Sequence, residues 1–195
     1  MIENYNTLKE DFGHTSSWAL WSEEKLSETA IIEANKDKLH NKVIIVGLNV
    51  SADINKDWEN FHSGNHDRKL KKLFNESSYH GAYMTDIIKE YPEADSSQTD
   101  YKDPKLREPN IKIFLDEMKL LGVDENALFI LFGNETKNIF FDELMFHYKN
   151  AVHCMHYSYR SITDNNYIIQ TKETLLGHYQ KTKNICGTEK FKPLE

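Results

Sequence analysis

The sequence predicts an α/β protein, a three-layer α/β/α sandwich around a central four-stranded parallel sheet. Its clearest strand is the apolar run Val43-Ile44-Ile45-Val46, which is rich in β-branched residues, too short for a helix and ended by Gly47. Such a run is typical of a strand buried on both faces. Four short apolar segments alternate with helical patterns along the chain. This alternation favours right-handed β-α-β crossovers and a parallel sheet between helices.

The length and composition predict a single domain over residues 1–195. No apolar stretch approaches the ~20 residues that a membrane-spanning helix needs, and residues 1–6 lack the pattern of a signal peptide. The two cysteines, Cys154 and Cys186, form no CxxC pair. These features disfavour iron–sulfur or zinc sites built on cysteine, and they predict a cytoplasmic protein.

The net charge of −7 disfavours broad, nonspecific binding to nucleic acid. The charge is uneven, however, because the segment from Asp67 to Lys72 carries four basic residues and one acidic residue. We interpret this segment as a solvated helix face, and a local basic surface is the alternative.

The first half of the chain is organised around the central strand. We expect a partly ordered lead-in over 1–20, a helix from Ser22 to about His40, the central strand over 42–48, a long loop over 50–66, a helix from Asp67 to about Glu76 and a second strand over 81–89. The helix after Ser22 is indicated by Leu26, Ala30, Ile31 and Ala34, which recur at helical spacing. Long ordered loops in compact domains are often functional.

The second half repeats the alternation of helix and strand. We expect an exposed excursion over 90–108, a helix from Pro109 to Gly122, a strand over 127–132, a helical segment over 134–148, a strand over 152–155, a last helix from the N-cap Thr163 to about Gln180 and a loose tail over 181–195. Proline suits the first turn of a helix and glycine its C-terminal end.

Each predicted strand is followed by a group that could face a ligand. These groups are Asn49, Asp86, Gly133 and His156. Ligands of parallel sheets bind outside the carboxyl ends of the strands. We therefore expect these residues, which are far apart in the sequence, to meet at one edge of the sheet.

Four segments resemble motifs of the uracil-DNA glycosylase superfamily. Gly47-Leu48-Asn49-Val50-Ser51 resembles the first motif, Gly-x-Asn-Pro-Gly/Ser, and the segment from His156 to Ser161 resembles the second, His-Pro-Ser-Pro-Leu-Ser. Between them, Tyr83 to Lys89 is similar to the family's strand ending in Thr-Asn-x-x-Lys, and Leu128 to Gly133 is similar to its later strand ending in Gly. The motifs stand in the family's order from residue 43 to about 161.

The resemblance implies a domain that binds single- or double-stranded DNA, takes a flipped, damaged base into a pocket and hydrolyses its N-glycosidic bond without a cofactor. The implied catalytic residues are Asn49, which would orient the attacking water, and His156, which would donate a hydrogen bond to the base carbonyl. The implied base-binding residues are Gly47, Leu48, Val50, Phe61 and Asp86, and the implied DNA contacts are Ser51, Ser158 and the wedge residue Arg160. Phe61 would stack on the base, a contact worth about 1–3 kcal/mol, with Trp58 as the alternative aromatic.

Ordinary structural roles remain open for the same residues. Asn49 is also a good turn residue, Phe61 a core residue, His156 a structural histidine and Arg160 an exposed surface arginine. The chain lacks the prolines of both motifs, with Val50, Tyr157 and Tyr159 in their place.

Asp86 stands where family members often carry an asparagine that reads the base. An ionised aspartate can only accept hydrogen bonds, so it would bind uracil N3–H and repel O4. Asp86 therefore indicates a different base that presents a donor, or a protonated carboxyl in a dry pocket. A helix cap or a partner of Lys89 is the structural alternative.

Other classes of function explain the pattern less well. His62, His66, His153 and His156 suggest a metal hydrolase, but His153-x-x-His156 on a strand places the two side chains on opposite faces. The first motif is also not the Gly-x-Ser-x-Gly elbow of serine hydrolases. The stronger alternative is a non-catalytic module that binds nucleic acid, a nucleotide or a protein through the same fold.

Overall fold

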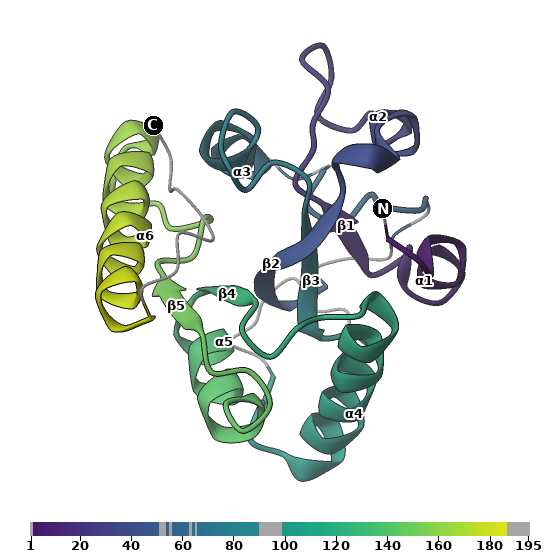
Figure 1. Cartoon of the computed structure of the whole chain (residues 1–195), viewed down its shortest axis with the longest axis vertical. Helices are drawn as coiled ribbons and strands as arrows, with labels where there is room; N and C mark the ends of the chain where they lie inside the picture. The colour runs from purple at the N-terminus through teal and green to yellow at the C-terminus, as the bar shows by residue number, and fades with distance from the viewer. Residues whose placement is uncertain are drawn as a thin grey trace.

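The computed structural model describes residues 2–50, 54, 56–62, 64, 66–89 and 99–186, with side chains up to residue 183. The fold is α/β and its centre is one five-stranded sheet in the order β1-β3-β2-β4-β5 (Figure 1). The strands are β1 (Ser16–Trp18), β2 (His40–Asn49), β3 (Ala82–Ile88), β4 (Leu128–Phe132) and β5 (Ala151–Cys154). Strands β2 to β5 run parallel, and β1 pairs antiparallel with β3.

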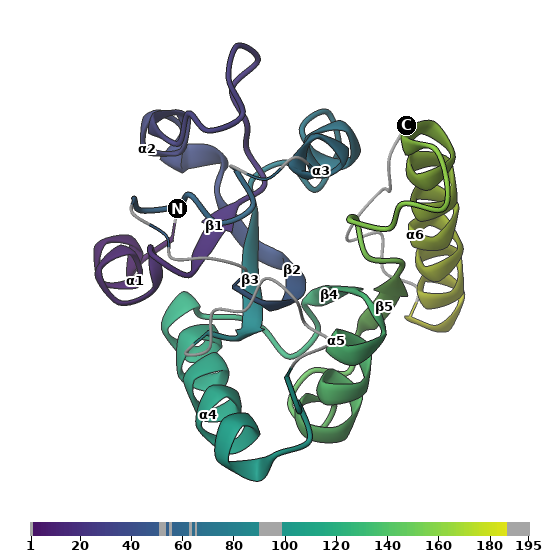
Figure 2. The same ribbon diagram turned by 180° about the vertical axis from the view of Figure 1, so that it is seen from behind.

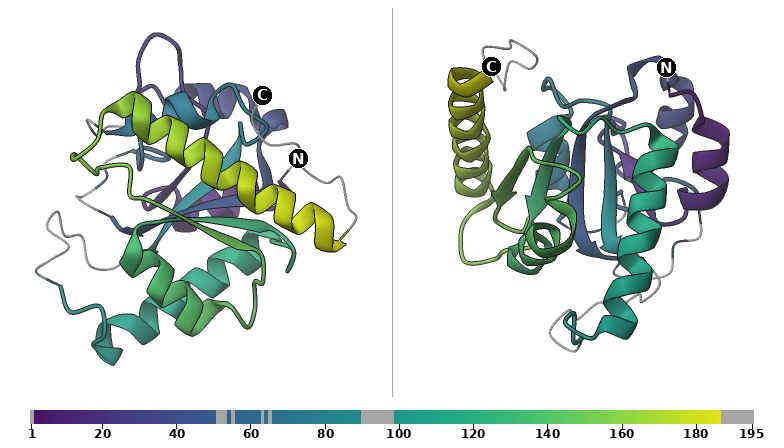
Figure 3. Two further views of the ribbon diagram at one scale, coloured as in Figure 1. Left: turned by 90° about the vertical axis from the view of Figure 1, so that its left-hand side faces the viewer. Right: turned by 60° about the horizontal axis from the view of Figure 1, so that its bottom comes forward.

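Helices cover both faces of this sheet, as the views from behind and from the edge show (Figures 2 and 3). One face is covered by α1 (Tyr5–Phe12), α2 (Ala30–Ala34), α4 (Pro104–Leu121), α5 (Asn134–Ile139) and the π-helical turn η3 (Phe140–Leu144). The other face is covered by α3 (Asp67–Phe74) and α6 (Asp164–Cys186). A 3-10 turn, η1 (Lys36–Lys38), leads into β2.

The central strand β2 explains why both faces need a cover. Ile44 and Val46 pack into the first core cluster, with α1, α4 and α5, whereas Val43 and Ile45 pack into the second, with α3 and α6. All four side chains are fully buried. Burying a valine or isoleucine side chain contributes roughly 1.5–3 kcal/mol, so this strand is a large part of the hydrophobic core.

The prediction of four parallel strands is correct for β2 to β5 but wrong for the sheet as a whole, because β1 adds a fifth, antiparallel strand. The prediction of a partly ordered lead-in over 1–20 is also wrong, because α1 and β1 lie there. Ser16 and Trp18 of β1 are fully buried, and the Tyr83 hydroxyl oxygen lies 2.7 Å from Ser16 Oγ. Pairing with β3, far along the sequence, therefore orders this segment.

The predicted helix from Ser22 to about His40 is wrong over most of its length. Only Ala30–Ala34 and the turn Lys36–Lys38 are helical. Contacts from α3 hold the start of the predicted helix in a loop. Lys71 Nζ donates to Ser22 O at 3.0 Å and to the Glu23 side chain at 2.9 Å. These tertiary contacts override a helical pattern of moderate strength.

The other helices depart from prediction mainly at their ends. Helix α4 begins at Pro104, not at Pro109, because the Asp103 side chain caps it by accepting from the Lys105 N–H. Gly122 ends it in the left-handed conformation, with φ +70°, as predicted. Helix α6 continues to Cys186, so residues 181–186 of the predicted tail are helical, while residues 187–195 lie outside the described residues.

Among the described residues, no helix combines the length and the apolar character that crossing a membrane requires.

Candidate functional site

The ends of β2 and β3 bring Gly47 and Asp86 side by side. The two residues are register partners on these neighbouring strands. A Cβ added to Gly47 would lie 2.1 Å from Asp86 Oδ1 and 3.3 Å from Phe61 Cε1. Glycine at position 47 therefore makes room for the Asp86 carboxyl and the Phe61 ring. The two strands and the loop of Phe61 form one buried corner of the second core cluster.

Asp86 is a buried carboxyl, 3% exposed, whose hydrogen bonding is set by Asn60. The Asn60 Nδ2 donates to Thr15 O at 2.8 Å and to Asp86 Oδ2 at 2.8 Å. Since only the amide nitrogen can donate to a carbonyl, Thr15 fixes the orientation of Asn60, which donates to Asp86 in either protonation state. The other carboxyl oxygen, Oδ1, faces Gly47 and carries the proton when Asp86 is neutral.

The pKa of Asp86 is set by opposing effects. Burial raises its pKa to about 7, although the hydrogen bond from Asn60 and the charge of Lys89 both lower it, and Glu117 and Asp67 raise it. Near neutral pH the carboxyl is therefore partly protonated, and its Oδ1 can either donate or accept a hydrogen bond.

Phe61 is held in a backbone conformation that bulky residues rarely adopt, with φ +65°. Its carbonyl accepts from Trp21 Nε1 at 3.2 Å, and its ring lies 6.3 Å from the Tyr157 ring. Trp58, the alternative aromatic, packs against Tyr5 and Trp18 in the first core cluster. Phe61 is therefore the aromatic of the two that adjoins Asp86.

His156 follows β5 and lies against the backbone of Gly133, which follows β4. A Cβ on Gly133 would be 3.4 Å from His156 Cδ2, and the His156 ring stacks on Tyr157 with centroids 4.5 Å apart. The Tyr157 ring is therefore a neighbour of both the His156 ring and the Phe61 ring. Of the four strand-end positions predicted from the sequence, Gly133 and His156 are in contact. Asp86 instead adjoins Gly47 and Phe61, and Asn49 has other partners.

The tautomer of His156 follows from its contacts. Its Nδ1 accepts the backbone N–H of Ser158 at 3.2 Å and lies 2.7 Å from Ser158 Oγ. A backbone N–H can only donate, so Nδ1 has no proton and Nε2 carries it in the neutral ring. Burial is the main cause that lowers the pKa of His156 to about 4, and the nearby His66 also lowers it. At neutral pH His156 is thus an uncharged donor through Nε2.

We expect nuclear magnetic resonance of the imidazole nitrogens to find His156 as the neutral Nε2–H tautomer at pH 6. Its titration midpoint should lie near pH 4, because burial disfavours the charged ring. Assignment with a His156→Gln variant identifies the signal, and a midpoint near 6.5 would contradict the buried, neutral donor.

Asn49 ends β2 and is oriented by groups within the chain. Its Oδ1 accepts from the Tyr101 hydroxyl at 3.3 Å, and its Nδ2 donates to Val50 O at 3.2 Å. Tyr101 packs in the first core cluster, as does the half-buried Leu48, so the Leu48 side chain faces away from Asp86. Val50 is buried, and its N–H donates to Ile88 O at 3.3 Å.

Two of the three predicted DNA contacts, Ser158 and Arg160, lie in the turn after His156. Ser158 braces His156, and Arg160 is exposed. Ser51 lies outside the described residues.

Sequence reasoning missed three residues of this region, Asn60, Tyr101 and Lys69. Asn60 holds Asp86, Tyr101 orients Asn49, and the buried Lys69 Nζ donates to Tyr159 O at 3.0 Å. Asn60 adjoins Phe61 in the loop over 50–66, whose length indicates a functional segment. The other two lie in a polar excursion and on a basic helix, where no local pattern distinguishes them from surface residues.

Among the described residues, no group of three or more His, Cys, Asp or Glu side chains could hold a metal ion. Comparisons of the chain with protein-family models, with curated proteins and with solved structures find no match. The functional interpretation therefore depends on the contacts of the strand-end residues themselves.

Proposed function

We propose that the chain is a DNA glycosylase-like hydrolase that cleaves the N-glycosidic bond of a flipped, deaminated base. The observation that carries the proposal is the strand order β3-β2-β4-β5, which aligns Asp86, Gly47 and His156 along one edge of the sheet. Two of these are polar side chains with displaced pKa values, and such groups cluster at functional sites.

His156 would stabilise the leaving base. When an N-glycosidic bond breaks, negative charge develops on a carbonyl oxygen of the base. A neutral Nε2–H donor can hydrogen-bond to that oxygen without first losing a proton, and such positioned donors supply about 10²–10³ in rate. The low pKa of His156 keeps the ring in this form at neutral pH.

Asn49 would hold the attacking water. An amide is a poor base, so its contribution is positional. The hydrogen bond from Tyr101 to its Oδ1 fixes the plane of the amide, and fixed geometry is what a water-orienting group needs.

Asp86 would read the base. A neutral carboxyl donates through Oδ1 to a base carbonyl, and an ionised one accepts from a ring N–H. Uracil, hypoxanthine and xanthine all present a carbonyl beside a ring N–H. The Phe61 ring, fixed next to Gly47, would supply the stacking face.

The test is base release from labelled oligonucleotides that carry uracil, hypoxanthine, xanthine or a mismatch, in single- and double-stranded form. Abasic sites are revealed by alkali. We expect release of one base, reduced about 10²-fold in Asn49→Ala because the water loses its positioning group.

Asn126→Ala is the matched control, since Asn126 is exposed and contacts Asp124 in its own turn. If Asn49→Ala and the control released the base at equal rates, Asn49 would have no role in orienting the water. Folded protein that releases no base from any substrate would overturn the hydrolase.

The second candidate is a module of the same fold that binds nucleic acid, a nucleotide or a protein without cleaving it. It is favoured by one observation, namely that both ends of the Asn49 amide already have partners within the chain. Tight binding of a base-containing ligand without release would support this alternative.

A further inference from the structure

The corner where α3 meets the turn 156–160 concentrates positive charge on an otherwise acidic chain. Lys69 is 3% exposed. Its Nζ donates to Tyr159 O at 3.0 Å and lies 4.8 Å from the centroid of the Tyr167 ring. The buried lysine therefore fixes the first turn of α3 against the turn that carries His156. Helices α3 and α6 lie on the same side of the sheet (Figures 1 and 3).

The acidic residues of this corner are already engaged. Asp67 is 4% exposed, and its Oδ2 accepts the Gly64 N–H at 2.7 Å. Asp164 Oδ1 lies 3.4 Å from Lys69 Nζ. Lys69 thus offsets the charge of Asp164, and Asp67 is buried at the start of α3.

Two arginines supply exposed positive charge at this corner. The chain has three arginines, of which Arg107 pairs with Asp142 and Glu143. Arg68 and Arg160 are exposed, and neither forms an ion pair with any residue in the described part of the chain.

The hydrogen bond from Lys69 to Tyr159 O joins this positive corner to the turn that carries His156, and the pKa of His66 is sensitive to the same charges. Burial is the largest cause that lowers the pKa of His66. The charges of Lys69, Arg160 and Arg68 also lower it, and the charge of Asp164 raises it. His66 in turn lowers the pKa of His156. Arg68 and Arg160 are the sequence neighbours of Lys69 and Tyr159, which are joined by a hydrogen bond of 3.0 Å, so both arginines flank the contact between α3 and the turn that carries His156.

We propose that Arg68 and Arg160 form a binding site for the phosphodiester backbone of single-stranded DNA, beside the base site at the strand ends. The inference rests on the proposed function and adds a residue of α3, Arg68, to the DNA contacts. Arginine is the side chain best suited to phosphate, because its planar fork donates two parallel hydrogen bonds. With a net charge of −7 the chain repels a polyanion elsewhere, so it favours a single strand, which has the lower charge density.

The test measures the affinity of full-length protein for a fluorescent oligonucleotide without a damaged base, over a range of salt concentrations. Each phosphate contact with a single strand contributes about 0.7 to the slope of log K against log salt. We expect Arg68→Ala/Arg160→Ala to lower the slope by about 1.4 and to weaken binding roughly tenfold at physiological salt. Arg68→Lys/Arg160→Lys should retain most of the slope, because it keeps both charges.

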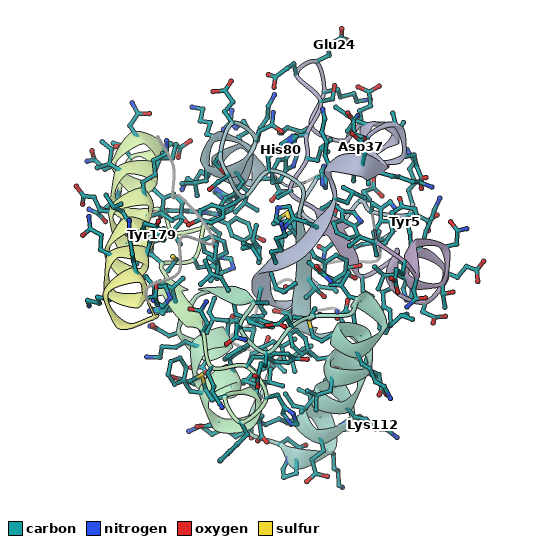
Figure 4. The ribbon with its side chains drawn as sticks, viewed as in Figure 1. Tyr5, Glu24, Asp37, His80, Lys112 and Tyr179 are labelled. Atoms are coloured by element: carbon teal, nitrogen blue, oxygen red, sulfur yellow. The ribbon has the colours of Figure 1, made fainter. Side chains whose placement is uncertain are left out.

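The matched control is Lys112→Ala/Lys119→Ala, which removes the same charge from exposed positions on α4; Figure 4 labels Lys112. An equal loss in the control would show only an effect of net charge and would overturn the inference. The inference would also be overturned if the wild-type protein did not bind a single strand or bound duplex more tightly. It would be overturned too if free inorganic phosphate, at the same concentration of phosphate groups, competed as well as the oligonucleotide. Because undamaged DNA is used, binding without any base release would leave this inference standing while the hydrolase fails.

Discussion

Replacing Asp86 with asparagine is expected to stabilise the fold at pH 8 by up to about 4 kcal/mol more than at pH 4. Burial raises the folded-state pKa of Asp86 to about 7 from 3.8. Between these values the folded protein keeps a proton that the unfolded chain has released, so stability from the neutral carboxyl is lost as pH rises from about 4 to about 7. Above that range the folded protein contains a buried, charged carboxylate. Asparagine has the same shape, can still accept from Asn60 and never ionises.

The measurement is the free energy of unfolding of wild type and of Asp86→Asn, obtained by chemical denaturation across this pH range. The difference between the two free energies is compared at each pH. The difference is needed because His40, His62 and His156 have pKa values lowered to about 4 by burial, and they titrate in the opposite sense. Asp116→Asn is the control, because it makes the same change of residue at an exposed position of α4. A constant difference for Asp86→Asn would mean that folding does not raise the pKa of this carboxyl, which would then be ionised at neutral pH and unable to donate to a base.

Glu117→Ala is expected to lower the free energy of unfolding by about 3–5 kcal/mol, because it leaves the Lys89 ammonium buried without its counter-charge. Glu117 is fully buried in α4, and its Oε2 lies 2.9 Å from Lys89 Nζ. Its Oε1 accepts from Tyr83 and Thr85, both at 2.9 Å. Lys89 also donates to Thr85 and to Asp86 O. This network joins β3 to α4 on the face of the sheet opposite the Asp86 side chain.

The double variant Lys89→Met/Glu117→Gln separates the charge effect from the loss of packing. It removes both charges and retains an acceptor for Tyr83 and Thr85, so we expect it to be more stable than Glu117→Ala. Glu125→Ala, at an exposed position, should change stability by less than about 0.5 kcal/mol. A double variant as unstable as Glu117→Ala would assign the loss to packing and not to the unpaired charge.

The parts of the fold that the sequence predicts are those with a strong local signal. The β-branched run of β2 and the apolar run of β4 are strands because each buries side chains on both faces. Gly122 ends α4 because glycine adopts a positive φ without strain. Thr163 caps α6, with its Oγ1 accepting the Asn166 N–H at 3.3 Å, as its position before a helical pattern predicts.

The parts that the sequence does not predict depend on distant partners. Strand β1 has only three residues, and its partner β3 begins more than sixty residues later. No local pattern encodes such a pairing. The same distinction applies to the candidate site. The positions of strand-end residues such as Asp86 and His156 can be predicted from the order of strands and helices. Asn60 and Tyr101 are recognisable only once their hydrogen bonds are seen.

The pairing of β1 with β3 also constrains the order in which the chain can fold. During synthesis α1 and β1 emerge first, but β1 needs residues 83–85 of β3, and the Asn4 side chain donates to Leu120 O at the end of α4. The segment β1 therefore waits for residues 83–85, and Asn4 waits for Leu120, 116 residues later. Such non-local contacts slow folding and leave apolar groups such as Trp18 exposed in the meantime. Closure of the β1 edge therefore depends on a strand that is made more than sixty residues later, and it cannot be a local, early step in folding.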